Sequence, residues 1–275
     1  MLKSTERQSG AIGVFDSGVG GLSVMNEIAE ELPHEDVVYF ADTVHCPYGR
    51  RTHQEIQRLT RGIVTFLLSQ GAKVIVVACN TASAAALYHL RESFSLPIVG
   101  MEPAVKPAVE RTDSKVVGVI ATEATFQGAL FASLVERFAT DIEVLTQTCP
   151  GLVERVEAGL IGDTGTKEML REYLQPMLGA AIDSLVLGCT HYPFLKPLMR
   201  EIMGDGVKII DPSPAVARQT RRVLKREGLL RAGRQGRYTF YTSGDPQVFA
   251  RMVEGLTPLK GPVQAARWAG GEIVT

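Results

Sequence analysis

The sequence lacks long apolar runs and has no excess of charge of either sign. Its longest apolar stretches, such as residues 74–79, fall far short of the ~20 residues that span a bilayer, so we expect no membrane contact. The 29 Lys and Arg offset the 30 Asp and Glu, which argues against a dedicated nucleic-acid binder. Residues 1–10 are polar and lack the apolar region of a signal peptide, so we expect a cytoplasmic protein.

Cysteine is also scarce, with four residues in a chain of 275. In a chain that is not exported, four cysteines are expected to be free thiols rather than disulfides. The chemistry of these thiols is therefore a guide to function.

Short apolar runs alternate with longer segments of helical spacing. Strands are predicted at residues 12–15, 37–40, 74–78, 98–101, 116–120, 142–145, 185–187 and 207–210. Amphipathic helices are predicted at residues 22–32, 52–70, 82–93, 126–138 and 167–178. This alternation predicts an α/β fold with parallel sheets flanked by helices and right-handed crossovers.

Four short strings recur in the second half of the chain in the same order. They are GVFDS (13–17) with GVIAT (118–122), Cys46-Pro47 with Cys149-Pro150, VVACNT (76–81) with VLGCT (186–190), and PAV (103–105) with PAV (214–216). Such a repeat indicates two copies of one α/β lobe, each with a pair of cysteines. We expect the lobes to be related by a pseudo-twofold axis, with the active site in the cleft between them.

The lobe boundaries are expected in the proline clusters at residues 97–107 and 212–214. By symmetry, the first lobe is predicted to contain residues 1–103 and 215–275. Residues 104–214 then form the second lobe.

Cys79 and Cys189 each follow a predicted strand and precede a polar residue. The carboxyl ends of parallel strands are where ligands bind, and the start of the next helix stabilises an anion such as a thiolate. Either cysteine alone would more often be an ordinary core residue. Because the two occur as a matched pair, we interpret them as functional.

The turn after the first strand is rich in glycine, but it is not a dinucleotide-binding motif. The third glycine of that motif would fall at Ser23, and no phosphate-binding lysine follows. The glycines allow backbone N–H groups to approach a small anion at the helix start. Asp16 would repel a phosphate there, so it is expected to handle a proton or an ammonium group, with helix capping as the alternative.

Other polar residues near the predicted strand ends are further candidates. His191 lies two residues beyond Cys189, where it could relay a proton. Tyr48 and Gly49, and likewise Asn80 and Thr81, could bind carboxylate oxygens. Glu157 could line the cleft or be a solvated helix residue, and the sequence leaves this open.

A metal site is the alternative interpretation of the cysteine and histidine residues. It would use Cys189 and His191, with Cys46, His45 and Cys149 as further ligands. No C-x-x-C or H-x-x-x-H spacing supports it, so we predict no metal.

Residues 218–237 hold eight Lys or Arg and one acidic residue. A solvated helix face followed by a loop is the usual origin of such a run. Contact with a polyanion is the alternative.

Two thiols on opposite sides of one carbon suit the inversion of a carbon acid, which needs a base on one face and an acid on the other. One thiolate and one thiol can exchange these roles according to the enantiomer bound. No cofactor motif is visible, although spacing does not exclude a pyridoxal lysine.

Several motifs together resemble bacterial glutamate racemases, in the superfamily that also contains aspartate racemases. They are GVFDSGVGG (13–21), PYG (47–49), ACNTA (78–82), LGCTHYP (187–193) and SGDP (243–246). The resemblance spans nearly the whole chain. It implies a cofactor-independent two-base isomerase that supplies D-glutamate for peptidoglycan and cell-wall synthesis.

The resemblance also implies roles for individual residues. Cys79 would deprotonate D-glutamate with help from Asp16, and Cys189 would deprotonate L-glutamate with help from His191. Glu157, in VEAG (156–159), would be an additional acid. The implied substrate contacts are Asp16, Ser17, Tyr48, Gly49, Asn80, Thr81, Thr190 and His191, whereas Cys46 is expected to be structural.

Three alternatives remain. In an aspartate racemase, the second cysteine motif would resemble Cys-Thr-Glu, whereas residues 189–191 here are Cys-Thr-His. A hydrolase using Cys189 and His191 would need only one thiol, and a bilobal amino-acid binding protein would need none. The resemblance further implies a homodimer, while regulation by cell-wall precursors and any partner of residues 218–237 are left open.

Overall fold

The computed structural model describes residues 9–275, so most of the polar segment at residues 1–10 lies outside the described residues. The chain forms two compact units. The first contains the described residues up to Met101 together with Ser213–Thr275, and the second is Glu102–Pro212. Among the described residues, no helix is both long and apolar enough to cross a membrane.

The first unit contains a parallel six-stranded sheet in the order β10-β9-β2-β1-β3-β4. Its strands are β1 (Ala11–Asp16), β2 (Val37–Ala41), β3 (Ala72–Val77), β4 (Ile98–Gly100), β9 (Tyr238–Thr242) and β10 (Val263–Ala265). Its α-helices are α2 (Leu22–Glu31), α3 (His53–Ser69), α4 (Asn80–Ser93), α11 (Ser213–Arg226) and α12 (Pro246–Leu256). Short 3₁₀ turns, η1 (Thr43–His45) and η2 (Tyr48–Arg50), follow β2, and an antiparallel hairpin of β11 (Arg267–Ala269) and β12 (Glu272–Val274) ends the chain.

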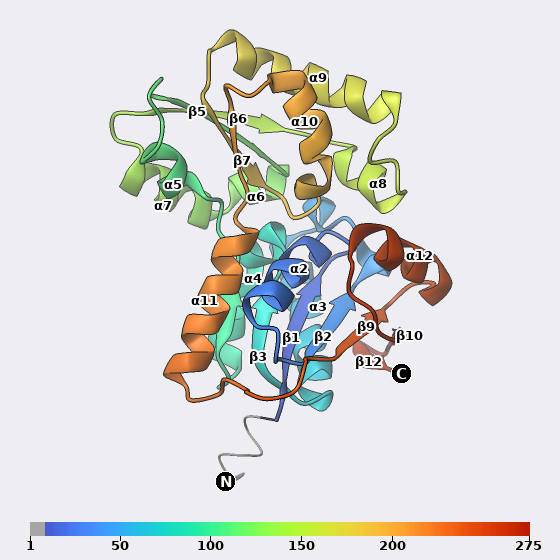
Figure 1. Cartoon of the computed structure of the whole chain (residues 1–275). Coiled ribbons are helices and arrows are strands. Elements are labelled where there is room, and N and C mark those ends of the chain that lie inside the picture. Colours follow the sequence, from blue (N-terminus) through green and yellow to red (C-terminus); the bar gives the residue numbers. More distant parts are fainter. Residues whose placement is uncertain (1–8) are drawn as a thin grey trace. The chain divides into compact units, whose positions relative to one another are not determined.

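Helices cover both faces of this sheet (Figure 1). Successive residues of a strand point to opposite faces, as β2 shows. Tyr39 stacks on Phe249 of α12, with ring centroids 6.3 Å apart, whereas Phe40 packs against Phe66 of α3 at 5.5 Å. Because both faces are buried, the strands are almost continuously apolar.

The second unit contains a parallel four-stranded sheet in the order β6-β5-β7-β8. Its strands are β5 (Val116–Ala121), β6 (Glu143–Thr148), β7 (Ser184–Gly188) and β8 (Lys208–Ile210). Its helices are α5 (Val105–Val109), α6 (Glu123–Gln127), α7 (Ala129–Phe138), α8 (Leu152–Glu157), α9 (Thr164–Gly179) and α10 (Lys196–Met203), with the 3₁₀ turn η3 (Tyr192–Leu195) after β7. Val117 and Val119 share one core with Phe131 of α7, while Gly118 faces Met177 of α9 on the other side of β5.

The strand order of the second unit repeats that of the first. β6-β5-β7-β8 corresponds to β2-β1-β3-β4. In both sheets the strands, counted along the chain, lie in the order second, first, third, fourth. The α/β fold and the duplication predicted from the sequence are therefore confirmed. All eight predicted strands are present, with ends that differ by a few residues.

The helix predicted at residues 126–138 is wrong as a single element. Gly128 is extended (φ −71°, ψ 135°) and divides it into α6 and α7. The strand β9 was missed, although its aromatic and β-branched sequence, YTFYT, is typical of strands. It pairs with β2 and brings the end of the chain into the first unit.

The basic stretch at residues 218–237 begins on α11 and continues into the following loop. Part of its charge is compensated within the first unit. Arg221 pairs with Glu31 at 3.0 Å, and Arg231 and Arg234 both pair with Asp36.

Asp183 holds together the starts of the two central strands of the second unit. It immediately precedes β7, and its Oδ2 accepts the backbone N–H groups of Asp113 (2.6 Å) and Ser114 (2.9 Å), which lie just before β5. Burial acts to raise the pKa of Asp183, but hydrogen bonds outweigh it and lower the pKa to about 2.

Asp183→Asn should lower the free energy of unfolding by about 1 kcal/mol near neutral pH, because the amide accepts these hydrogen bonds less strongly and solvent weakens them. A carboxyl with a lowered folded pKa stabilises the protein above its unfolded pKa and loses this contribution as the pH falls. The difference from wild type in urea unfolding should therefore shrink between about pH 4 and pH 2. Asp205→Asn, at an exposed carboxylate of the same unit, is the control; a difference that persists undiminished in acid would contradict the prediction.

Candidate active site

Cys79 lies where β3 ends and α4 begins. Its backbone is extended, it is the N-cap residue of α4, and its Sγ accepts the backbone N–H of Ala82 at 3.4 Å. The apolar run of β3 gives way here to the alanine-rich sequence of α4, which fixes the cap at the cysteine. The thiol is buried, and a thiolate would accept this hydrogen bond more strongly than a thiol.

Asp16 is the last residue of β1, the strand that pairs with β3. Its carboxyl is fully buried, and Oδ1 accepts the backbone N–H of Ser17 (2.6 Å) and the Ser17 hydroxyl (3.2 Å). The N-cap of α2 is Gly21, which has no side-chain cap. The helix-capping alternative for Asp16 is therefore wrong.

Gly21 is required by close packing between the start of α2 and two strand ends. A Cβ atom there would lie 2.8 Å from the Asp16 Cβ, 2.8 Å from the Tyr39 hydroxyl and 3.1 Å from the Ala78 Cβ. A side chain at this position would therefore push α2 away from Asp16 and from Ala78, which directly precedes Cys79.

Tyr48, in η2, is buried and donates its hydroxyl to Oδ2 of Asp42 at 2.7 Å. Burial, followed by the negative charge of Asp42, raises the pKa of Tyr48 well above its ordinary value, and Cys79 and Asp16 act in the same direction. Tyr48 therefore keeps its proton and presents a neutral hydroxyl near the thiol and the carboxylate.

Asn80 and Thr81 open α4 and are buried beside Cys79. Among the described residues, neither the amide nitrogen nor the amide oxygen of Asn80 has a hydrogen-bond partner. A buried amide without partners costs free energy. A ligand with both donors and acceptors would relieve that cost.

Cys46 lies in the loop between η1 and η2, next to the PYG motif. Its thiol is half-buried and is 4.0 Å from the Ser17 hydroxyl. Gly49, in η2, is also half-buried.

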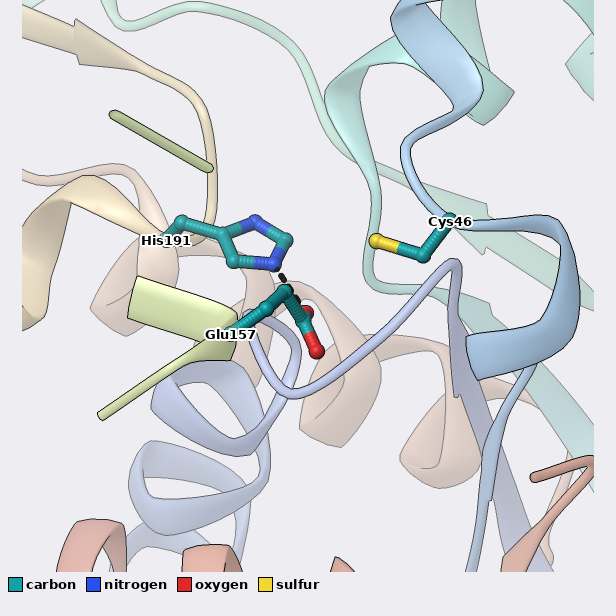
Figure 2. Close-up of side chains that lie close together, drawn as sticks. All are labelled: Cys46, Glu157 and His191. Atoms are coloured by element: carbon teal, nitrogen blue, oxygen red, sulfur yellow. Dashed lines mark hydrogen bonds and ion pairs between the residues drawn. The ribbon is translucent and has the colours of Figure 1, made fainter. Parts of the chain in front are cut away.

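In the second unit, Cys189 immediately follows β7, and an imidazole and a carboxyl lie beyond its thiol. Its Sγ is 3.7 Å from Nδ1 of His191. Nε2 of His191 is 2.6 Å from Oε1 of Glu157, and Figure 2 shows these two side chains. Beside an ionised Glu157, which can only accept a hydrogen bond, Nε2 of His191 would carry the ring proton and Nδ1 would face the thiol as an acceptor. His191 is buried, whereas Glu157 is partly exposed to solvent.

Two further buried groups surround Cys189. Burial, followed by the charge of Cys189, raises the pKa of Cys149 to about 12, and the Cys149 thiol contacts the carbonyl of Gln147 at 3.7 Å. Burial also raises the pKa of Tyr192 well above its ordinary value, with Cys189 next in effect. Thr190 is buried next to Cys189.

All the residues predicted from the sequence lie at or just after the carboxyl ends of strands, or on the helices and turns that follow them. Asp16, Ser17, Tyr48, Gly49, Cys79, Asn80 and Thr81 belong to the first unit, and Glu157, Cys189, Thr190 and His191 to the second. Within each unit taken alone, the described residues bring no three metal-ligating side chains together.

Sequence reasoning missed Asp42 and Tyr192. Asp42 directly follows β2 as Asp16 ends β1, so the same strand-end rule could have found it. With a buried thiol at one strand end of each unit, and a polar group beside each thiol, the fold and site define a class of enzyme able to move protons with cysteine.

Comparisons with known proteins agree with this class. Residues 12–220 match the family model for Asp/Glu/Hydantoin racemase. The chain is 51% identical over 258 residues to the glutamate racemase of Pseudomonas syringae pv. tomato, which covers 93% of this chain and 94% of that relative. The chain therefore belongs to the Asp/Glu/Hydantoin racemase family, among its glutamate racemases.

Solved structures give the same result. The glutamate racemase isoform RacE1 of Bacillus anthracis has a TM-score of 0.86 and 33% identity, covering 96% of this chain and 98% of its own. The Escherichia coli glutamate racemase, solved with L-glutamate and the activator UDP-MurNAc-ala, has a TM-score of 0.84 and 30% identity, covering 94% of this chain and 99% of its own.

Cys149 should resist alkylation in the folded protein, because its thiol is buried and its pKa is raised to about 12. Brief treatment with iodoacetamide near pH 8, followed by peptide mass spectrometry, should modify the half-buried Cys46 much faster than Cys149. In denaturant the two should react at similar rates, and rapid modification of native Cys149 would contradict the assignment.

Proposed function

We propose that this protein interconverts L- and D-glutamate by a two-base proton transfer between the substrate and two cysteines. The observation that carries the proposal is the presence of one buried strand-end thiol in each repeated unit, Cys79 and Cys189. Membership among the glutamate racemases supports glutamate as the substrate. The Escherichia coli relative was solved with L-glutamate bound.

In the L-to-D direction, the Cys189 thiolate removes the α-proton and the Cα–H bond breaks. The Cys79 thiol then donates its proton to the opposite face, so a new Cα–H bond forms with inverted configuration. In the D-to-L direction, Cys79 is the base and Cys189 the acid. No proton is gained or lost overall, but each turnover exchanges the protonation states of the two thiols.

His191 and Glu157 support Cys189 in this scheme. Nδ1 of His191 accepts the thiol proton, and Glu157 stabilises the positive charge that forms on the imidazole ring. On the other side, Asp16 assists Cys79, whose thiolate is stabilised by the N-terminus of α4.

In this scheme, uncharged amide and hydroxyl groups provide most of the contacts to the substrate. We propose that the partnerless amide of Asn80 binds the amino-acid head of glutamate, together with Thr81 and Ser17. Tyr48 and Gly49 provide further contacts in the first unit. In the second unit, Thr190 and His191 complete the set, and donors aimed at the carboxylate stabilise the charge that develops as Cα loses its proton.

We further propose that the reaction needs no cofactor and supplies D-glutamate for peptidoglycan synthesis in the cytoplasm. The lobes predicted from the repeat are proposed to correspond to the two units. A homodimer is the proposed assembly. Sedimentation of the purified protein tests the assembly independently of activity.

The two-base scheme predicts where solvent hydrogen appears. In heavy water, early product formed from L-glutamate should carry deuterium at Cα, while the remaining L-glutamate should keep its original hydrogen, because a different thiol reprotonates each face. Chiral separation with mass spectrometry, on chelator-treated and pyridoxal-free protein, measures both pools. If the α-hydrogen exchanges with solvent in neither L- nor D-glutamate, racemisation is refuted. The two enantiomers of aspartate, tested in parallel, are the substrate control.

Cys79→Ala and Cys189→Ala should each reduce racemisation by at least about 10³-fold, because each removes a group that bonds to the transferred proton. Cys46→Ala removes a half-buried thiol outside the proton-transfer scheme and should retain most activity. Circular-dichroism assays of both directions provide the measurement. A Cys79→Ala variant that racemises glutamate as fast as the wild type would overturn the two-base scheme.

A further inference from the structure

Asp42, at the end of β2, is a fully buried carboxylate that gathers donors from distant parts of the first unit. Its oxygens accept the Tyr48 hydroxyl at 2.7 Å, the Ser243 hydroxyl at 2.9 Å and the indole N–H of Trp268 at 2.8 Å. Nδ1 of His45 lies 3.0 Å from both oxygens. Residues near the end of the chain thus converge on the loop that contains the PYG motif.

The segment at residues 42–50, hereafter the substrate loop, has further contacts with the end of β9. The Thr43 and Thr242 hydroxyls are 2.9 Å apart, and the backbone N–H of Val44 donates to the Ser243 hydroxyl at 3.0 Å. Both bonds join residues that are 199 positions apart in the sequence.

Trp268 is itself fixed by the core. Its ring meets the His45 ring edge-on, with centroids 5.4 Å apart. A Cβ atom at Gly62 on α3 would lie 2.8 Å from the Trp268 ring, so the indole fits closely against the bare backbone of that helix. The indole therefore presents its N–H to Asp42 from a fixed place.

A buried carboxylate is stable only when hydrogen-bond donors compensate its charge. Removal of one donor therefore raises the free energy of the buried carboxylate and weakens the network around it. The Tyr48 hydroxyl donates its hydrogen bond to Asp42, so the carboxylate sets the orientation of the Tyr48 ring. The orientation of Tyr48 and the path of Gly49 thus depend on Asp42 and its C-terminal donors.

We propose that Asp42 is a positioning residue which, together with Trp268 and Ser243, holds the substrate loop in the conformation that binds substrate. This inference rests on the proposed function, in which Tyr48 and Gly49 contact glutamate. Asp42 does not touch the transferred proton in this scheme. Its contribution is to binding rather than to the chemical step.

Trp268→Phe keeps the aromatic packing and removes only the N–H donor, and Ser243→Ala removes a second donor. Each should raise KM for both enantiomers about tenfold while kcat stays within about twofold, because the bases Cys79 and Cys189 are untouched. Asp42→Asn should raise KM at least as much. If Asp42→Asn does not fold, the two donor variants still decide the question.

Tyr241→Phe is the matched control. It removes one hydroxyl from the same strand, β9, where Tyr241 donates to Gln70 at 2.9 Å on the α3 side of the sheet. It should reduce stability by an amount similar to that of Trp268→Phe and leave KM unchanged. An equal rise of KM in Tyr241→Phe would show a general structural effect and overturn the proposal.

The alkylation rate of Cys46 provides a readout that does not depend on racemisation. This half-buried thiol lies within the substrate loop, and tryptic peptide 8–50 contains no other cysteine. The rate should rise several-fold in Trp268→Phe and Asp42→Asn, but not in Tyr241→Phe.

The two readouts separate the failure of each proposal. If the wild type does not racemise glutamate but Cys46 reacts faster in the donor variants, the proposed function fails and the loop-holding role of Asp42 stands. If the wild type racemises glutamate and KM is unchanged in the donor variants, the role of Asp42 in substrate binding is overturned. Unchanged Cys46 reactivity would overturn the loop-holding role itself.

Discussion

The parallel pairing of each cysteine-bearing strand with the central strand of its sheet is the constraint on which the rest of the structure depends. β3 pairs with β1 and β7 pairs with β5, so each pair of strands ends at the same edge of its sheet. Cys79 therefore emerges beside the strand that ends in Asp16, and Cys189 emerges at the equivalent place of the second unit. Helices begin at this edge, and their free N–H groups make it suitable for anions.

The two units support their thiols by different means. The Cys79 sulfur accepts a backbone N–H at the start of α4, whereas Cys189 faces an imidazole that is itself held by Glu157. A backbone donor stabilises a thiolate without taking up its proton, while an imidazole can also accept that proton. The thiol thus has the same place in the strand order of both units, whereas the groups around it differ.

Asp42 extends the same strand-end logic to a neighbouring strand, but its donors come from elsewhere in the chain. A strand-end carboxylate after β2 was foreseeable from the pattern that identified Asp16. Its bond to Trp268 was not, because the two residues are 226 positions apart and meet only when the hairpin after β10 packs against α3. The contact between His191 and Glu157, 34 positions apart, depends in the same way on how α8 packs beside η3.

The sequence by itself determined the alternation of strands and helices, the duplicated order of the strands and the cysteine at one strand end of each copy. These features are local, because burial on both faces of a sheet or on one face of a helix imposes its period directly on the residues. Tertiary structure decided what the local signals left open: the break at Gly128, the pairing of β9 with β2 and the donors around Asp42. A buried polar group takes partners from any chain segment that folding brings within hydrogen-bond distance, and no local pattern records which segment that is.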